Sequence, residues 1–515
     1  MPDNIRSFPA SCQGGLINNM DYLTQGASVP GSALRMINYE PALEGGYRRI
    51  SGYTNVYGEV PGAEGNPVLG VAVYSLVNNG IFACRIPASG SDYFNYWDNA
   101  TEAWVTPSLG VSLTTAGITK VRFSKLNWGV PKLVLTDGVN PPATWDGTTY
   151  TQMTGDLTPS APKFNEIFAS HLFLAGDSSA PNSIYFSAPL SEPDFNPGSG
   201  AGVINVGFEV KALKSFRDQL YIFGINSIKK LTGTSIADFV LTDVTKNLGC
   251  ISSDSVIEFN GEILFLSPDG IRPVTGTERI GDIELGTLSK PVQSIFEAYS
   301  RNEDLDAITM VTVGRKSQFR LFFANAEALG LIGSLRTAGQ SGQGFEYSQL
   351  VGMEVYCADS GYIGTEEFVI HGDSLGKVHR QEQGYDFDGN PIFSLYQTPY
   401  LYQDDPILRK IYYDVSTYMR AEGKVSVNIG IEYDYGDSAT SVPTGYEFTT
   451  EGAASYWGQA TYDTTDIYDG NPSPIRKTNL QGSGDSISLT YVTTETQPSH
   501  TIQSFVVSYS LADRR

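Results

Sequence analysis

The sequence has 515 residues, of which only 17% are charged, while 54 are glycine and 12% are aromatic. Soluble proteins are usually about a quarter charged and about 7% glycine, so this composition argues against a helical protein and favours aromatic strands joined by tight turns. The formal net charge of −22 repels nucleic-acid phosphates, which disfavours DNA wrapping but allows a conduit through which DNA slides without sticking.

The N-terminus and the cysteines bear on where the protein is made. The first ten residues, MPDNIRSFPA, lack the apolar run of a secretory signal, and the longest apolar tract, Val68 to Val77, is too short to cross a bilayer. We therefore expect no membrane insertion by this chain and assembly in a reducing cytoplasm. Four cysteines lie far apart without a C-x-x-C pair, so we expect free thiols at Cys12, Cys84, Cys250 and Cys357.

A short hairpin pattern recurs along most of the chain. Seven units, each an apolar triplet, a turn and a second short strand, begin at residues 71, 133, 172, 220, 263, 320 and 368. These starts are 39 to 62 residues apart, near the roughly 40 to 50 residues of a four-stranded blade. The spacing predicts a β-propeller of six to seven blades. Several dipeptides suit two-residue hairpin turns: Asn79-Gly80, Asp137-Gly138, Asp146-Gly147, Asn260-Gly261 and Asp269-Gly270.

Two segments interrupt the repeat. The aromatic segment YFNYWDNATEAWVTP lengthens the first interval and is expected to form an additional hairpin, an inserted arm in which Trp97 and Trp104 pack on one sheet face. A short helix is expected from Pro291 to about Ser300, because apolar residues recur there at helical spacing after a proline suited to the first turn. We expect this helix to pack between blades.

Beyond about residue 395 the pattern changes to longer alternating strands. In KVSVNIGIEYDYGD the apolar residues occupy every second position, which places them on one face of a strand. We predict an all-β protein: an N-terminal arm and first strands at 1–65, a β-propeller at 66–395, and a smaller C-terminal β-sandwich-like platform domain at 396–515. The residues expected on buried faces of the platform are Val425, Val427, Ile429, Ile431, Tyr433, Ile487, Leu489, Tyr491, Phe505, Val507 and Tyr509.

The segment Gly372-Asp373-Ser374-Leu375-Gly376 matches the G-x-S-x-G pattern of a nucleophilic serine. That pattern needs a strand-to-helix turn above a parallel sheet. The residues KVHRQE that follow read instead as the return strand of the seventh hairpin. We therefore interpret Ser374 as a turn residue and expect the flanking His371 and His379 to be exposed.

Other patterns fall short of a chemical site. Asp386, Asp388 and Asn390 begin like a calcium loop, but Pro391 and Gln397 stand where a glycine and a glutamate are required. The glycine-rich segment at 198–202 lacks the third glycine of a dinucleotide-binding loop. The four histidines are scattered, and acid pairs point to opposite faces in an extended strand (His171, His371, His379, His500, Glu366-Glu367, Asp404-Asp405). We predict no enzyme and no catalytic, cofactor-binding or metal-binding residues.

The start of the chain carries a family resemblance. The segment from Gly14 to Thr54 has a G-G-L start, a small-residue stretch ending at Asn38, then G-Y-R-R at Gly46 to Arg49 and a second G-Y at Gly52-Tyr53. It resembles the opening of tail nozzle proteins, also called packaged-DNA stabilisation proteins, of short-tailed bacteriophages. The segments LGCISSDSVIEFNGEILFLSPDGIRPVTG and QTPYLYQDDPILRKIYYDV look like the central blade and the second-domain junction of that family.

The resemblance implies a structural component of the virion tail. It implies a propeller with a smaller β platform, six copies closing a ring below the portal and the adaptor, and a lumen that retains and then conducts genomic DNA without sequence-specific binding. The implied partners are other copies of the chain, the tail adaptor, and tailspike or fibre and needle proteins. It also implies no enzymatic activity. Insert lengths differ within the family, so the channel-lining residues are left unknown.

The main alternative is a glycan-binding or glycan-cleaving β-propeller of a tail fibre or secreted lectin, which would also be acidic and aromatic. A glycosidase needs two carboxylates that converge in a pocket. Tyr-rich segments serve either an interface or ordinary sheet packing, and two are candidates for interface anchors, namely Tyr93 to Trp97 and Tyr456-Trp457.

Overall fold

A computed structural model describes residues 5–78, 80–87, 93–274, 287–300, 305–323, 328–338, 342–403, 405–437, 443–449, 474–496 and 498–512. Asn79, Asp404, Tyr456 and Trp457 lie outside the described residues. Within these ranges, none of the helices has the length and apolar character needed to cross a bilayer.

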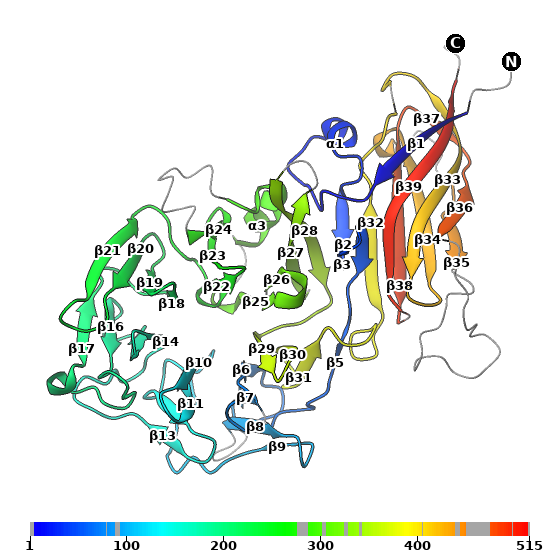
Figure 1. Ribbon diagram of the computed structural model, residues 1–515. Helices are drawn as coiled ribbons and strands as arrows, with labels where there is room; N and C mark the ends of the chain where they lie inside the picture. Colours follow the sequence, from blue (N-terminus) through cyan, green and yellow to red (C-terminus); the bar gives the residue numbers. More distant parts are fainter. Residues whose placement is uncertain are drawn as a thin grey trace.

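Six small antiparallel sheets stand in a ring and form a β-propeller (Figure 1). The first sheet contains β6 (Val68–Val73), β7 (Ile81–Arg85), β8 (Phe94–Asp98) and β9 (Ala103–Val105). The second sheet contains β10 (Arg122–Asn127), β11 (Pro131–Thr136), β12 (Ala143–Trp145) and β13 (Tyr150–Gln152). The next two are β14 (Phe164–Phe168), β15 (His171–Ala175), β16 (Ser183–Phe186), β17 (Gly202–Asn205), and β18 (Ala212–Phe216), β19 (Gln219–Phe223), β20 (Ile228–Thr232), β21 (Val240–Thr245). The last two are β22 (Ile257–Phe259), β23 (Glu262–Ser267), β24 (Gly270–Pro273), and β29 (Cys357–Ile363), β30 (Glu366–Gly372), β31 (Val378–Gln381), β5 (Tyr53–Thr54).

A nine-stranded sheet joins this ring to the rest of the molecule. Its first strands occupy the place between β22 and β29, and the sheet then runs away from the ring. In sheet order the strands are β25 (Thr309–Val313), β26 (Gln318–Phe322), β27 (Leu329–Ala338), β28 (Gly342–Val351), β2 (Arg35–Ile37), β32 (Ile392–Gln397), β38 (Ile487–Glu495), β34 (Ser426–Tyr433) and β35 (Tyr446–Thr449).

A seven-stranded sheet covers the far part of the nine-stranded one and completes the platform (Figure 1). Their facing residues form one core, which includes Val427, Tyr491 and Phe505. The strands of the second sheet are β3 (Tyr39–Pro41), β4 (Tyr47–Arg49), β39 (His500–Leu511), β33 (Lys410–Ala421), β36 (Ile475–Asn479), β1 (Arg6–Ser11) and β37 (Ser483–Gly484).

The predicted all-β propeller with a C-terminal β domain is confirmed. All seven hairpins are present, and in β34 the predicted residues are buried at every second position. The turn between β22 and β23 is Asn260-Gly261, with φ of 48° and 77°, as a two-residue hairpin requires. Arg217-Asp218 forms an equivalent turn with φ of 48° and 57°, although arginine, unlike aspartate, rarely adopts positive φ.

The prediction of an inserted arm is wrong. Its residues form β8 and β9, the two outer strands of the first sheet. Trp97 lies opposite Trp104 in register, with ring centroids 5.6 Å apart in an edge-to-face arrangement, and Tyr57 packs against both rings. The aromatic residues therefore stabilise the blade itself.

The short helices serve as connectors. The predicted helix is present as the 3₁₀ turn η3 (Lys290–Val292) followed by α3 (Gln293–Ser300), and Val292, Ile295 and Phe296 pack into the large core. An additional helix, α1 (Tyr22–Ser28), lies above β2 and beside β1 in the view of Figure 1. The remaining helical turns are η1 (Pro197–Ser199), η2 (Ser253–Ser255), η4 (Leu305–Ala307), η5 (Gly314–Lys316) and η6 (Asp434–Gly436).

The N-terminal segment is divided among three sheets. β1, β3 and β4 join the seven-stranded sheet, β2 lies between β28 and β32, and β5 pairs with β31. The last small sheet is thus completed by a strand from the beginning of the chain, which fastens the end of the ring to its start. The same segment ties this ring to the platform.

Candidate functional site

The axis of the propeller is a channel of about 530 Å³. The innermost strands of the ring line it, namely β6, β10, β14, β18, β22, β25 and β29. Charged side chains of both signs reach into it: Lys120, Arg122, Lys125, Glu166, Lys214, Asp254, Glu258 and Asp359.

Ion pairs cross this channel between sheets that are not neighbours. Arg122, on β10, donates two hydrogen bonds to the Asp254 carboxylate of η2, at 2.7 and 3.0 Å. Lys120 Nζ lies 3.5 Å from the same carboxylate, and Lys125 Nζ lies 3.0 Å from Asp359 on β29. Burial alone would raise the pKa of Asp254, but the charges of Arg122 and Lys120 outweigh it and lower that pKa. The carboxylate is therefore ionised and held by two cations.

These contacts set an upper limit on what can occupy the channel. The major groove of a DNA duplex is by itself about 12 Å wide, whereas side chains from separate sheets touch across the axis at 2.7 to 3.5 Å. A duplex cannot pass along the axis of a single propeller.

The Glu166 carboxyl group in the channel has a raised pKa. Burial raises the pKa of Glu166, the nearby Lys214 lowers it, and Glu258 raises it further. Glu166 Oε1 accepts a hydrogen bond from Ser215 N at 3.2 Å. A carboxyl group that holds its proton at higher pH than usual is what a general acid needs, so this is the position where the alternative glycosidase reading can be tested.

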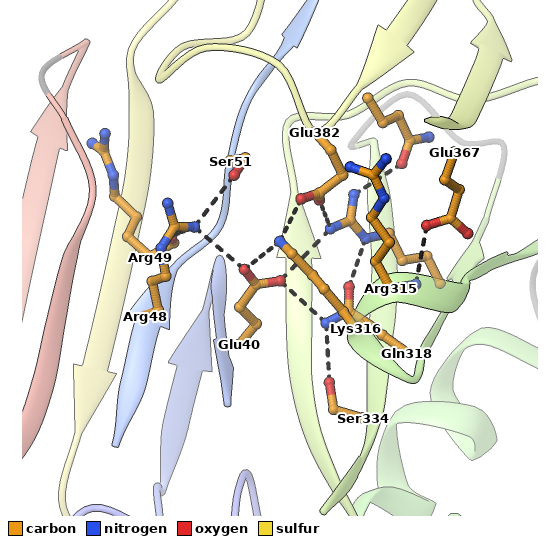
Figure 2. A network of polar contacts seen from close by, with 12 residues as sticks. Glu40, Arg48, Arg49, Ser51, Arg315, Lys316, Gln318, Ser334, Glu367 and Glu382 are labelled. Atoms are coloured by element: carbon orange, nitrogen blue, oxygen red, sulfur yellow. Dashed lines mark hydrogen bonds and ion pairs between the residues drawn. The ribbon is translucent and has the colours of Figure 1, made fainter. Parts of the chain in front are cut away.

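A second polar cluster lies where the propeller meets the platform (Figure 2). Its centre is Glu40 on β3, whose side chain is only 3% exposed. Glu40 Oε1 lies 2.6 Å from Lys316 Nζ and 3.4 Å from Arg48 Nη1, while Oε2 lies 3.7 Å from Arg320 Nη2. Gln318 Nε2 donates to Glu40 Oε2 at 3.1 Å. One carboxylate therefore connects β3 and β4 to η5 and β26. We call this cluster the joint.

Glu382 provides a second anion at the joint. It pairs with both Lys316 and Arg320, and Arg320 also donates to the Gln381 side chain at 2.9 Å. Burial would raise the pKa of Glu382, but the charges of Arg320 and Lys316 outweigh it and lower that pKa to about 2. The buried Glu40 and the half-buried Glu382 thus neutralise a fully buried arginine and a lysine, which satisfies the requirement that buried charges be paired.

The G-Y-R-R element supplies the platform side of the joint. Arg48 donates two hydrogen bonds to the Glu422 carboxylate, at 2.6 and 2.9 Å. Arg49 is fully buried and donates to the main-chain oxygens of Glu495 and Tyr385, at 3.0 and 3.2 Å. Gly46 has φ of 84°, and a Cβ there would lie 2.2 Å from the Ile502 carbonyl oxygen. These residue types are therefore required by the packing.

Asn38 fixes the neighbouring strands. Its φ is 55°, and its side-chain nitrogen donates to the carbonyl oxygens of Val351 and Phe393, at 2.9 and 2.8 Å. Its side-chain oxygen accepts from Val351 N at 3.0 Å. One asparagine thus pairs with main chain on both sides of β2, and asparagine tolerates positive φ better than most residues.

A groove of about 420 Å³ opens above the joint. The β3–β4 turn forms one wall, where Leu43 is 99% exposed, and the ion pair between Glu44 and Arg420 spans this region. Its charged lining residues balance in number, with three acids and three bases (Glu40, Glu44, Glu422, Arg48, Lys316, Arg420).

The serine motif lies in a hairpin, as expected. Ser374 is a half-buried residue of the turn between β30 and β31. The Asp373 carboxylate accepts from Leu375 N and Lys377 N, at 3.0 and 2.7 Å, and its other oxygen lies 3.0 Å from His379 Nε2. The histidine contact of this segment is thus made by Asp373, which shapes the turn.

The expectation that His371 and His379 are exposed is wrong. Both are buried, and their rings stack with centroids 5.0 Å apart. Tyr53 of β5 packs on both rings, at 4.9 and 4.8 Å. Burial, then the charges of His379 and Arg320, lowers the pKa of His371 well below its ordinary value. Alternation along β30 and β31 carries the two histidines to one covered face, where the closing strand meets them.

The remaining sequence motifs are structural. Asp386 Oδ1 accepts from Gly389 N at 2.8 Å, which closes a turn. Glu366 pairs with Arg380, whereas Glu367 accepts from Gly314 N and Arg315 N, so the two acids point apart. No group of three or more potential metal ligands converges among the residues that the structure describes.

The cysteines and the first aromatic segment are buried. Cys12, Cys84, Cys250 and Cys357 are free thiols, and burial raises the pKa of each one. Tyr93, Phe94 and Trp97 are at most 9% exposed. In a single chain these aromatic residues therefore serve sheet packing.

Known proteins were compared with the chain. No protein-family model and no curated protein matches it. It is similar to an extracellular domain of a one component system from B. thetaiotaomicron (11% identity, TM-score 0.40), covering 67% of this chain and 41% of that one. It is also similar to Hsv2 from Kluyvelomyces marxianus (9% identity, 53% and 80% covered, TM-score 0.31) and an exo-beta-1,3-galactanase from Phanerochaete chrysosporium (10% identity, 89% and 100% covered, TM-score 0.26). Likenesses this distant carry no argument about function.

Proposed function

We propose that this chain is a structural subunit of a short-tailed bacteriophage tail, a nozzle-ring component that retains and then conducts genomic DNA. The observation that carries the proposal is the place of the nozzle-like segment in the fold. Asn38, Gly46 to Arg49 and Gly52-Tyr53, which carry the resemblance, fasten the propeller to the platform and close the propeller ring. The resemblance thus rests on the residues that give the subunit its shape.

The channel supports a particular form of this proposal. Because ion pairs cross the axis of the propeller, DNA has no route through one subunit. The conduit is instead a lumen enclosed by several copies, and we propose a homo-hexameric ring. A net charge of −22 suits such a lumen, since a wall that repels phosphate lets DNA slide.

The proposed setting is the virion tail, with assembly in the host cytoplasm. There the ring docks to the tail adaptor and to tailspike or fibre and needle proteins. The buried charge pairs at the joint hold propeller and platform as one wedge, which suits a part that must keep its shape under load. A wedge that presents different faces to its two neighbours closes into a ring through heterologous contacts.

Native mass spectrometry and electron microscopy of the full chain, with and without the adaptor protein of the same phage, test the proposal. We expect rings of six copies, at least when the adaptor is present. A chain that stays monomeric at every concentration and with the adaptor would count against a nozzle. Duplex DNA is expected to bind weakly and with no preference for sequence.

The alternative, a glycan-cleaving propeller, is tested at Glu166. Glycan turnover that is lost in Glu166→Gln and kept in Glu209→Gln, an acid outside the channel lining, would favour the alternative. We expect no turnover by the wild-type chain.

A further inference from the structure

Three tyrosines gather at the end of the platform that bears α1. Tyr400 is the central ring: its centroid lies 6.1 Å from that of Tyr22 on α1 and 5.1 Å from that of Tyr435 on η6. Tyr400 itself is buried, whereas Tyr22 is 57% exposed and Tyr435 is 42% exposed. Leu23, beside Tyr22, is 44% exposed. We call these four residues the tyrosine surface.

The fold builds this arrangement from three separate segments. Gly26 of α1 packs so closely on the Tyr400 main chain that a Cβ would lie 2.0 Å from the carbonyl oxygen. Tyr400 donates its hydroxyl to Glu432 Oε2 at 2.8 Å, which anchors the central ring to the end of β34. The outer two rings therefore pack on an anchored central ring, while about half of each remains open to solvent.

The turn that presents Tyr435 is unusual. Asp434, Tyr435 and Gly436 have φ of 51°, 60° and 75°, so three residues in succession occupy the left-handed region. Aromatic residues rarely adopt this conformation. The turn is pinned by Asp434 Oδ1, which accepts from Asp485 N at 2.5 Å. A glycine or asparagine would fit the turn with less strain, so the backbone conformation does not explain why residue 435 is a tyrosine.

Carboxylates lie near the exposed rings: Asp21 caps α1 next to Tyr22, and Asp434 directly precedes Tyr435. Burial raises the pKa of Tyr435, and the nearby Tyr402, Asp21, Asp485 and Asp434 raise it further, which places three acids within electrostatic reach of its hydroxyl. Glu432 lies at the base. The nearby Lys410 ammonium is buried and donates to the carbonyl oxygens of Asp405 and Asp485. The tyrosine surface is thus aromatic and lies beside several carboxylates.

This chemistry selects one class of occupant. Aromatic faces attract cations through the ring quadrupole, and carboxylates beside them add charge and hydrogen-bond acceptors. A guanidinium group satisfies both, because it is planar, stacks on a ring and bridges a carboxylate with two donors, whereas an ammonium is a more strongly hydrated point charge. We propose that the tyrosine surface docks an arginine-bearing segment of a partner protein, with guanidinium groups stacked on the exposed rings of Tyr22 and Tyr435.

Fluorescence anisotropy with a labelled hexa-arginine peptide tests this proposal on the full chain. We expect hexa-arginine to bind more tightly than hexalysine, and Tyr435→Gly and Tyr22→Ala each to weaken its binding by about two- to fivefold. Tyr362→Ala is the matched control, because Tyr362 is a 55% exposed tyrosine on β29 of the propeller. It should leave the affinity unchanged.

Tyr435→Gly is expected to melt no lower than the wild type, since glycine relieves the turn, and Tyr435→Asn serves as a second variant for the same reason. Equal binding of hexa-arginine by wild type and all variants would overturn the proposal, because it would mean that the net charge alone attracts the peptide. Binding of a neutral oligosaccharide that is lost in Tyr22→Ala, with no arginine preference, would also overturn it.

Discussion

The Tyr39 hydroxyl lies 2.7 Å from Nε2 of His500, and both side chains are fully buried. Burial, then the charges of Arg49 and Arg48, lowers the pKa of His500 to about 3. An exposed histidine has a pKa near 6.5. His500 is therefore neutral in the folded protein at pH values where it is charged in the unfolded chain.

This difference makes stability depend on pH. Between about pH 6.5 and 3 the unfolded chain binds a proton at His500 that the folded chain does not, so the contribution of His500 is complete above about pH 6.5 and falls as the pH falls. The expected slope is up to about 1.4 kcal/mol per pH unit for each such histidine. We expect His500→Gln to flatten the stability profile between about pH 6.5 and 4.5, measured by urea unfolding. His371 should leave a residual slope.

Carboxylates with a lowered pKa, such as Glu382, affect stability in a lower pH range, because their contribution to stability is lost only as the pH falls below about 4.5. A profile for His500→Gln with the wild-type slope between pH 6.5 and 4.5 would contradict the assignment.

Loss of the central carboxylate of the joint should be costly. Glu40→Gln removes one of the two anions that neutralise Lys316 and the fully buried Arg320. Breaking a buried pair from one side costs about 3 to 5 kcal/mol. Because Glu382 still faces both cations, we expect a loss of about 3 kcal/mol in the free energy of unfolding, measured by denaturant titration.

Glu44→Gln is the matched control for Glu40→Gln. It removes the same functional group a few residues away, from a pair with Arg420 in which both side chains are more than half exposed. Exposed pairs are screened by water and salt, so no measurable change is expected. Equal effects of the two substitutions would refute the role assigned to the joint.

Alanine substitutions at Gly46 and Gly207 distinguish the cost of close packing from the cost of a strained backbone. Their φ values are 84° and 83°, but a Cβ at Gly46 would lie 2.2 Å from the Ile502 carbonyl oxygen, whereas nothing lies within 4 Å at Gly207. Gly207→Ala should cost about 1 to 2 kcal/mol for the left-handed backbone. Gly46→Ala should cost clearly more, and its melting temperature should be the lower of the two. The reverse order would contradict the close approach.

Substitutions of Ser374 and Asp373 test whether this segment is a structural turn or a catalytic site. Ser374→Ala should leave both the melting temperature and virion infectivity intact, because the carboxylate of Asp373, and not the serine, organises the turn. Asp373→Asn should destabilise the protein by about 1 to 3 kcal/mol through lost charge-assisted hydrogen bonds. A folded Ser374→Ala protein in a non-infectious virion would restore the serine as a functional residue.

The fold could be predicted from sequence where the signals are local. Turn dipeptides such as Asn260-Gly261, and alternation such as that from Val425 to Tyr433, report on adjacent residues, and their spacing was enough for a propeller followed by long paired strands. The aromatic segment containing Trp97 was misread because an outer strand pair of a blade has the same local pattern as an inserted hairpin.

The joint could not be predicted in this way. Glu40 and Arg320 are 280 residues apart in the sequence, and nothing local indicates that they pair. The available signal was a charged residue inside an otherwise apolar strand, as with Arg320 in QFRLF, which implies a buried partner without naming it. The burial of His371 and His379 under Tyr53 depended likewise on the closing strand, whose pairing is set by the whole ring.

The pairing of β5 with β31 has a consequence for synthesis of the chain. Tyr53 and Thr54 leave the ribosome more than 300 residues before Arg380 and Gln381, their partners. At about 5 to 20 residues per second, the first strands wait on the order of tens of seconds with unpaired edges. Chaperone capture during that interval, or pairing with a neighbouring nascent chain on the same messenger, would decide how much of the protein reaches its native topology.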